Sequence, residues 1–62
     1  MRLIDFLQLV PDTQEMQLVY EGFMLKGAED SLRCMLGEDI YNGIVTDVEA
    51  EDGLLKVWAK EG

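Results

Sequence analysis

The chain has 62 residues, of which 48% are hydrophobic and 29% are charged, and this is the composition of one small globular domain. A chain of this length buries only about 60% of the surface that its unfolded form exposes, so contact with a partner would add stability. Thirteen acidic residues against 5 basic ones give a net charge of −8, which disfavours direct binding to nucleic acid and to anionic membranes.

The first ten residues carry the apolar stripe of an amphipathic helix, with positions i, i+3, i+4 and i+7 occupied. Pro11 ends this helix because the residue before a proline is pushed out of the helical region. Asp5 and Gln8 interrupt the apolar run, which is too short for a membrane span and too broken for the core of a signal peptide. The stripe consists of Leu3, Phe6, Leu7 and Val10, widened by Ile4 and Leu9.

Residues 15–26 predict a first β-hairpin that turns at Glu21-Gly22. Because side chains alternate along a strand, this register gives the hairpin one apolar side and one mixed side. The apolar side pairs Tyr20 with Phe23, Leu18 with Leu25 and Met16 with Gly27, and the mixed side pairs Val19 with Met24 and Gln17 with Lys26.

Residues 27–37 predict a short second helix that starts near Asp30 and ends at Gly37. Its apolar stripe is Leu32, Met35 and Leu36. In the segment that follows, Ile40 or Tyr41 is expected to close the end of the core before a turn or bulge at Asn42-Gly43.

The C-terminal residues 44–61 predict a second hairpin around Asp52-Gly53, a dipeptide that accepts the positive φ angles of a type I′ turn. We expect Glu49 to attract Lys56 across the strands and Asp47 to attract Lys60 diagonally. One face is then mainly apolar: Ile44, Thr46, Val48, Ala50, Leu55, Val57 and Ala59. The other face pairs Glu51 with Leu54, Glu49 with Lys56, Asp47 with Trp58 and Val45 with Lys60.

The order of these elements predicts an α+β fold. Two hairpins, each with one apolar side, need a common cover, so we expect one antiparallel sheet of about four strands with two short helices on one face. The expected chain order is helix-β-β-helix-β-β within a single domain of residues 1–62.

Four parts of the chain form one pattern: the LxxFLxLVPDT frame of residues 3–13, the strand pair around Glu21-Gly22, the short Leu-rich helix, and the ending VTDVEAEDGLLKVWAKE. In this pattern the chain resembles a group of small acidic proteins carried by phages and prophages of Gram-positive gut bacteria. The resemblance covers most of the chain at the level of pattern and size. It implies an α+β fold and an origin in a mobile element, and it implies no reaction.

The sequence offers little catalytic chemistry. It contains no histidine, which removes the commonest general base and most nucleophile-base pairs. Cys34 has no second cysteine to pair with, is expected to fill the core, and together with the absence of a secretory signal indicates a cytoplasmic protein. Asp47, Glu49 and Glu51 alternate along one strand, but a solvated face is favoured over a site for a hard cation. No catalytic residue, metal or cofactor is therefore assigned.

Trp58 is the most informative side chain because the hairpin register places it on the charged face. If the two hairpins join edge to edge, neighbouring apolar side chains extend this position into a patch rimmed by charge, as is typical of contact surfaces. The candidate interface is Trp58, Leu54, Val45, Val19 and Met24. The favoured function is a non-catalytic protein-interaction module of phage or prophage origin, which forms a homodimer, binds another protein, or does both.

Two other functions stay open. The charge of −8 on a small body suits an acidic mimic of nucleic acid that inhibits a DNA- or RNA-binding protein. A more remote alternative is an enzyme that uses the carboxylates of Asp47, Glu49 and Glu51 with a metal ion.

Overall fold

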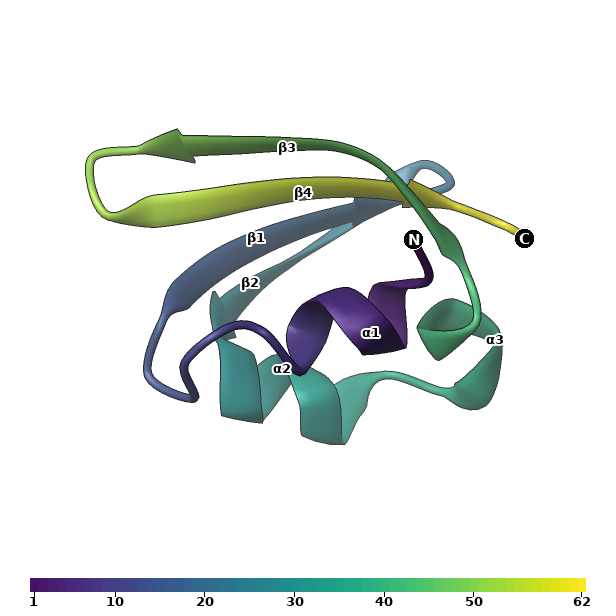
Figure 1. Ribbon diagram of the computed structural model, residues 1–62, viewed down its shortest axis with the longest axis horizontal. Helices are drawn as coiled ribbons and strands as arrows, with labels where there is room; N and C mark the ends of the chain where they lie inside the picture. Colours follow the sequence, from purple (N-terminus) through teal and green to yellow (C-terminus); the bar gives the residue numbers. More distant parts are fainter.

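Four strands form one sheet in the order β2-β1-β4-β3, and Figure 1 shows three short helices on one side of it. The computed structural model describes residues 1–62. The predicted α+β class and the predicted order of elements are confirmed, with α3 as an additional helical turn. The elements are α1 (Leu3–Leu7), β1 (Glu15–Tyr20), β2 (Phe23–Ala28), α2 (Glu29–Met35), α3 (Glu38–Tyr41), β3 (Ile44–Glu51) and β4 (Leu54–Lys60).

The two hairpins join through β1 and β4, which lie side by side and run parallel. The sheet is therefore mixed, and the expectation of a wholly antiparallel sheet is wrong for this central pair. Burial explains the arrangement, since the central strands carry all the buried strand residues while β2 and β3 carry exposed charges at the edges. The buried strand residues are Met16, Leu18, Tyr20, Val57 and Ala59.

The positive φ angles predicted for Asp52 and Gly53 are confirmed, and the first hairpin turns at Glu21-Gly22 as predicted, with positive φ at both residues. The register of β1 and β2 is confirmed in full. The register of β3 and β4 is confirmed from the turn outward as far as Asp47 opposite Trp58.

Beyond Asp47 the predicted register is wrong, because a bulge at Thr46 shifts the pairing. Val45 lies opposite Ala59 instead of Lys60, and it packs against the core. The bulged Thr46 donates its Oγ1 hydrogen to the carbonyl of Trp58 at 3.2 Å. An extra residue in one strand thus exchanges which side chain faces inward.

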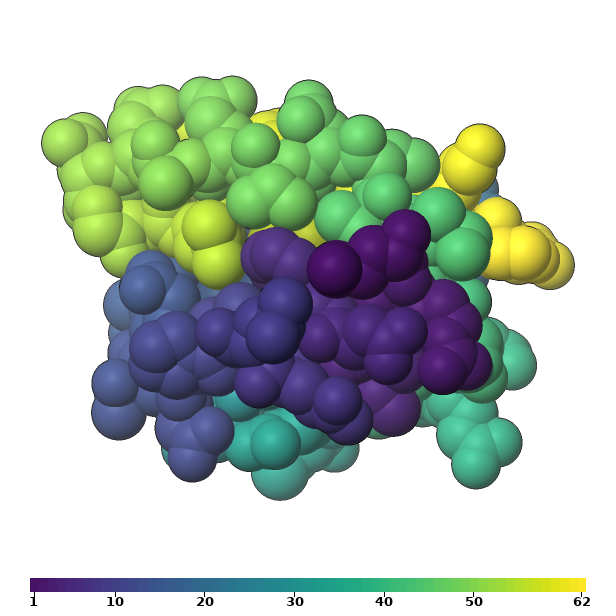
Figure 2. All heavy atoms as spheres, in the orientation of Figure 1, coloured from purple at the N-terminus to yellow at the C-terminus, as the bar shows by residue number.

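The start of the chain holds this irregular part of β3 in place. The amide of Leu3 donates to the carbonyl of Gly43 at 2.8 Å, and the amide of Val45 donates to the carbonyl of Met1 at 2.9 Å. Figure 2 shows the N-terminal segment, in purple, packed against the beginning of β3, in green. Contacts between residues 40 and 44 positions apart therefore accompany the shifted register, and a hairpin pattern alone does not encode them.

The helices cover the core through fewer side chains than expected. From α1 and α2 only Leu3, Leu7, Glu29 and Leu32 are buried, while Leu36 is buried just after α2. The predicted inward position of Met35 is wrong, since its side chain is 58% exposed, and Cys34 is also exposed. Compared with the prediction, α2 is rotated about its own axis. Its buried side chains are at positions 29 and 32, and the next buried side chain is at position 36, just after the helix.

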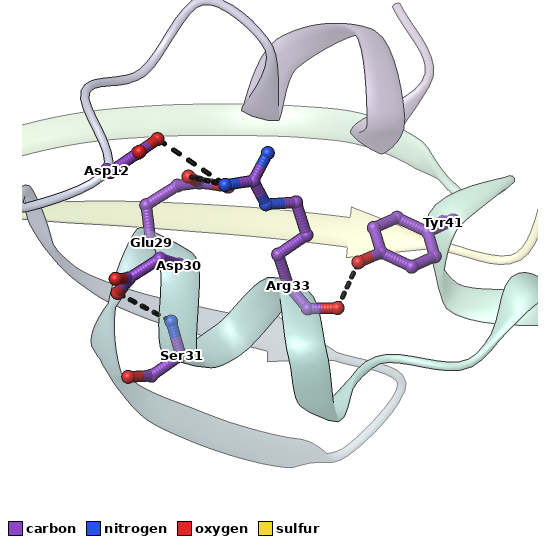
Figure 3. Close-up of polar contacts among 6 residues, drawn as sticks. All are labelled: Asp12, Glu29, Asp30, Ser31, Arg33 and Tyr41. Atoms are coloured by element: carbon purple, nitrogen blue, oxygen red, sulfur yellow. Dashed lines mark hydrogen bonds and ion pairs between the residues drawn. The ribbon is translucent and has the colours of Figure 1, made fainter.

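Glu29 is the only buried charged residue, and Arg33 links it to Asp12 in the loop before β1 (Figure 3). Nη2 of Arg33 lies 3.4 Å from both Oε1 of Glu29 and Oδ1 of Asp12, so one guanidinium bridges the helix and the loop. Neither carboxylate oxygen of Glu29 forms a hydrogen bond within the chain. The charge of Glu29 is balanced by Arg33. The backbone carbonyl of Arg33 also accepts a hydrogen bond from the hydroxyl of Tyr41.

Arg33→Ala should lower the free energy of unfolding by about 1–3 kcal/mol, because it leaves the buried Glu29 carboxylate without a counter-charge. The matched control is Asp12→Ala, which removes only the exposed half of the bridge and should cost about 0.5 kcal/mol or less. Urea unfolding measures both. Equal losses in the two variants would show that burial of Glu29 is not what makes the bridge important.

Gly43→Ala should destabilise the fold by about 1–3 kcal/mol because an added Cβ has no space. That atom would lie 2.8 Å from the carbonyl oxygen of Lys60, 2.8 Å from a ring carbon of Tyr20 and 3.0 Å from the carbonyl oxygen of Ile40. Gly37→Ala is the control, since its Cβ meets nothing within 4 Å and its φ is −85°. Thermal unfolding should separate the two variants, and equal melting temperatures would contradict the close packing at Gly43.

Candidate functional site

The face of the sheet turned away from the helices, here called the outer face, is uncovered (Figure 1). Side chains alternate along each strand, so the residues between the buried positions of β1 and β4 point to this face. The outer face therefore carries the residue between Met16 and Leu18 in β1 and the residue between Val57 and Ala59 in β4.

Three apolar side chains form one continuous row across the outer face, here called the Trp58 row. Val19 of β1 lies directly opposite Trp58 of β4, and Met24 of β2 lies opposite Val19. Asp47 of β3 ends the row on the far side of Trp58. The side chain of Met24 is 57% exposed, so the row is accessible to a partner at its outer end.

Two other members of the sequence-predicted interface lie elsewhere. Val45 leaves the outer face because the bulge turns it to the core. Leu54 stays on the outer face near the turn, four residues along β4 from Trp58, where it lines a shallow pocket of about 270 Å³ with Glu15 and Lys26. The structure thus brings together Trp58, Val19 and Met24 in the row, and places Leu54 beside a charged position.

A second row, here called the lysine row, runs next to the Trp58 row. It crosses the sheet as Lys26, Gln17, Lys56 and Glu49, from β2 to β3.

The ion pairs on this face differ from the sequence-based expectation. Nζ of Lys56 lies 3.5 Å from a carboxylate oxygen of Glu51, the diagonal neighbour, instead of pairing with Glu49. Asp47 does not pair with Lys60, because the bulge places Ile44 opposite that lysine. Lys26, Lys60, Asp47 and Glu49 consequently form no ion pair within the chain.

Sequence reasoning missed an acidic pocket of about 530 Å³ at the opposite end of the sheet from the Asp52-Gly53 turn. The rings of Tyr20 and Phe23 line it, with their centroids 5.9 Å apart. Glu21, Asp39 and Glu61 add three carboxylates to its wall, so its field disfavours an anionic ligand. The three acids come from separate parts of the chain, and no local sequence pattern signals their proximity.

The alternating carboxylates of β3 do not converge. Asp47, Glu49 and Glu51 are exposed along the edge of the sheet, and no group of three or more possible ligand side chains is placed to hold a metal ion. Ser31 donates its amide hydrogen to Oδ1 of Asp30 at 2.7 Å, and no histidine is available to activate its hydroxyl. The prediction that Cys34 fills the core is wrong, because the buried stripe of α2 passes through other positions.

Tyr20 should make the fold sensitive to alkaline pH. Burial raises the pKa of its hydroxyl above the ordinary value of 10.0, and the carboxylates of Glu21, Glu61 and Asp39 raise it further. The unfolded chain then loses this proton first, so the free energy of unfolding is unaffected below about pH 10 and falls as the pH rises above it. Urea unfolding between pH 8 and pH 11 should show this fall, and Tyr20→Phe should make it shallower. An identical pH dependence in both proteins would contradict the assignment.

Comparison with models of known protein families, with curated proteins and with solved structures gives no significant match. None of the helices has the length and apolar character needed to cross a bilayer. The case for a functional surface therefore depends on the geometry of the outer face.

Proposed function

We propose that this protein is a non-catalytic protein-interaction module that binds through the outer face of its sheet, with Trp58 as the anchor. Its simplest partner is a second copy of the same chain. The observation that carries the proposal is the Trp58 row, an apolar line across three adjacent strands on a face that no helix covers.

The chemistry around this row supports a protein partner. Tryptophan is enriched among residues that dominate binding energy, and a central apolar group surrounded by charged side chains is the common organisation of protein interfaces. Lys26 and Lys56 border the row on one side, and Asp47 ends it. Met24 adds a flexible apolar side chain that adapts to the shape of a partner.

Origin and location complete the proposal. The resemblance of residues 3–13 and of the C-terminal hairpin to phage and prophage proteins supports a mobile-element origin. An exposed single thiol at Cys34 is compatible with a reducing cytoplasm, where such a thiol stays unpaired.

An acidic nucleic-acid mimic is the second candidate, and the edge strand favours it. The side chains of Asp47, Glu49 and Glu51 project from the exposed strand β3 at intervals of roughly 7 Å, since alternate residues are two rises apart. Such a row suits the basic groove of a nucleic-acid-binding protein. Binding of that kind would weaken steeply as salt is added, whereas binding centred on Trp58 would depend on salt much less.

The experiment is analytical ultracentrifugation of the wild-type protein across micromolar concentrations. We expect a monomer-dimer equilibrium that Trp58→Ala abolishes and Met24→Ser weakens, because both substitutions remove apolar area from the row. Met35→Ser is the matched control, since Met35 is 58% exposed and Met24 is 57% exposed, but Met35 lies on α2 on the helix-covered side.

Circular dichroism confirms that each variant is folded before its association is compared. A wild-type protein that stays monomeric throughout would rule out the second copy as partner. Equal weakening by Met24→Ser and Met35→Ser would place the contact away from the outer face.

A further inference from the structure

We infer that the outer face is self-complementary about a two-fold axis that runs parallel to the strands between β1 and β4. This inference rests on the proposed function and specifies how two copies meet. In this arrangement β1 of each copy lies over β4 of the other, and β2 of each copy lies over β3 of the other.

The apolar centre fits this axis. Val19 and Trp58 are direct neighbours across the β1-β4 pair, so the rotation places Trp58 of each copy on Val19 of the other. Both apolar contacts fall next to the axis, at the centre of the interface, where water is excluded best. Two sheets packed face to face in this way lie about 10 Å apart, as in a β-sandwich.

The charges on the lysine row also fit this axis. Lys26 is on edge strand β2 and Glu49 is on the opposite edge strand β3, at the two ends of the same row. The rotation places Lys26 of each copy over Glu49 of the other, which gives two equivalent ion pairs. Neither residue has an ion-pair partner in its own chain, so both charges are available for this contact.

An in-plane axis perpendicular to the strands gives the opposite result. It stacks β2 on β2 and β3 on β3, so that the acidic side chains of one β3 face the acidic side chains of the other, and Glu49 no longer lies over Lys26. For a chain with a charge of −8, the stacked acids of two β3 strands would add local repulsion to the overall repulsion between the copies. The charge pattern therefore favours the axis parallel to the strands over the perpendicular one.

The size of the face sets the expected strength. Four strands spaced about 4.8 Å apart and about 20 Å long give a footprint of roughly 400 Å² on each copy. This is small for a specific interface and falls in the range of weak, transient complexes, so association is measured from micromolar concentrations upward.

The test is a charge exchange between Lys26 and Glu49. Lys26→Glu and Glu49→Lys should each weaken dimerisation about tenfold, because each creates two like-charge contacts per dimer. The double variant, Lys26→Glu with Glu49→Lys, should return to within about threefold of the wild type. Within one chain the two residues are three strand spacings apart, about 14 Å, which exceeds the Debye length of about 8 Å at physiological salt, so rescue reports a contact between copies.

Net charge provides an internal control. Lys26→Glu changes it from −8 to −10 and Glu49→Lys changes it from −8 to −6, whereas the double variant keeps −8. If only overall charge mattered, the two single variants would act in opposite directions. If the protein dimerises but the two single variants act in opposite directions, or the double variant shows only the sum of their effects, the axis is overturned and the proposed function stands. If the wild-type protein is monomeric, both the dimer and its axis are overturned.

The substitution Glu49→Lys places a second lysine opposite Lys56 in the same chain, so the folding of this variant must be checked first. If circular dichroism shows that this variant is unfolded, Lys26→Gln and Glu49→Gln replace the reversed charges in a double-mutant cycle. A coupling of about threefold or more in the dimerisation constant supports the contact, and strictly additive effects overturn it.

Discussion

The parallel pairing of β1 with β4 is the interaction on which the rest of the molecule depends. It joins two hairpins, neither of which has enough apolar surface to be stable alone in water. Leu18 and Val57 lie opposite each other in this pair and are almost completely buried, at 2% and 0% exposure. The buried residues of α1 and α2 join the core cluster that this pairing forms, and the edge strand β3 carries three exposed acids.

The same pairing produces the candidate site. A strand buries one set of side chains and presents the alternate set, so the register that places Leu18 beside Val57 also places Val19 beside Trp58. The Trp58 row therefore follows from the register of the core. A sequence change that shifts this register moves the buried residues and the Trp58 row together. Stability and recognition are linked here through the two-residue period of the strand.

Local chemistry predicted much of this fold. Glu21-Gly22 and Asp52-Gly53 set both turns, and counting outward from them gives nearly every antiparallel pair, including Asp47 opposite Trp58. The strand order, the bulge that turns Val45 inward and the acidic pocket were not predictable, because each depends on segments far apart in the chain. The rotation of α2 was missed because an apolar stripe does not reveal that Glu29 is buried beside Arg33, one helical turn later.

The position of β4 at the centre of the sheet also has a consequence for synthesis. The strand that completes the core, residues 54–60, follows every other element in the order of the chain. As the chain leaves the ribosome, β1 and β2 can form their hairpin early, but one side of β1 stays unpaired until β4 emerges. During that interval the strand is open to pairing with another chain, so prompt synthesis of β4 protects the newly made domain from aggregation.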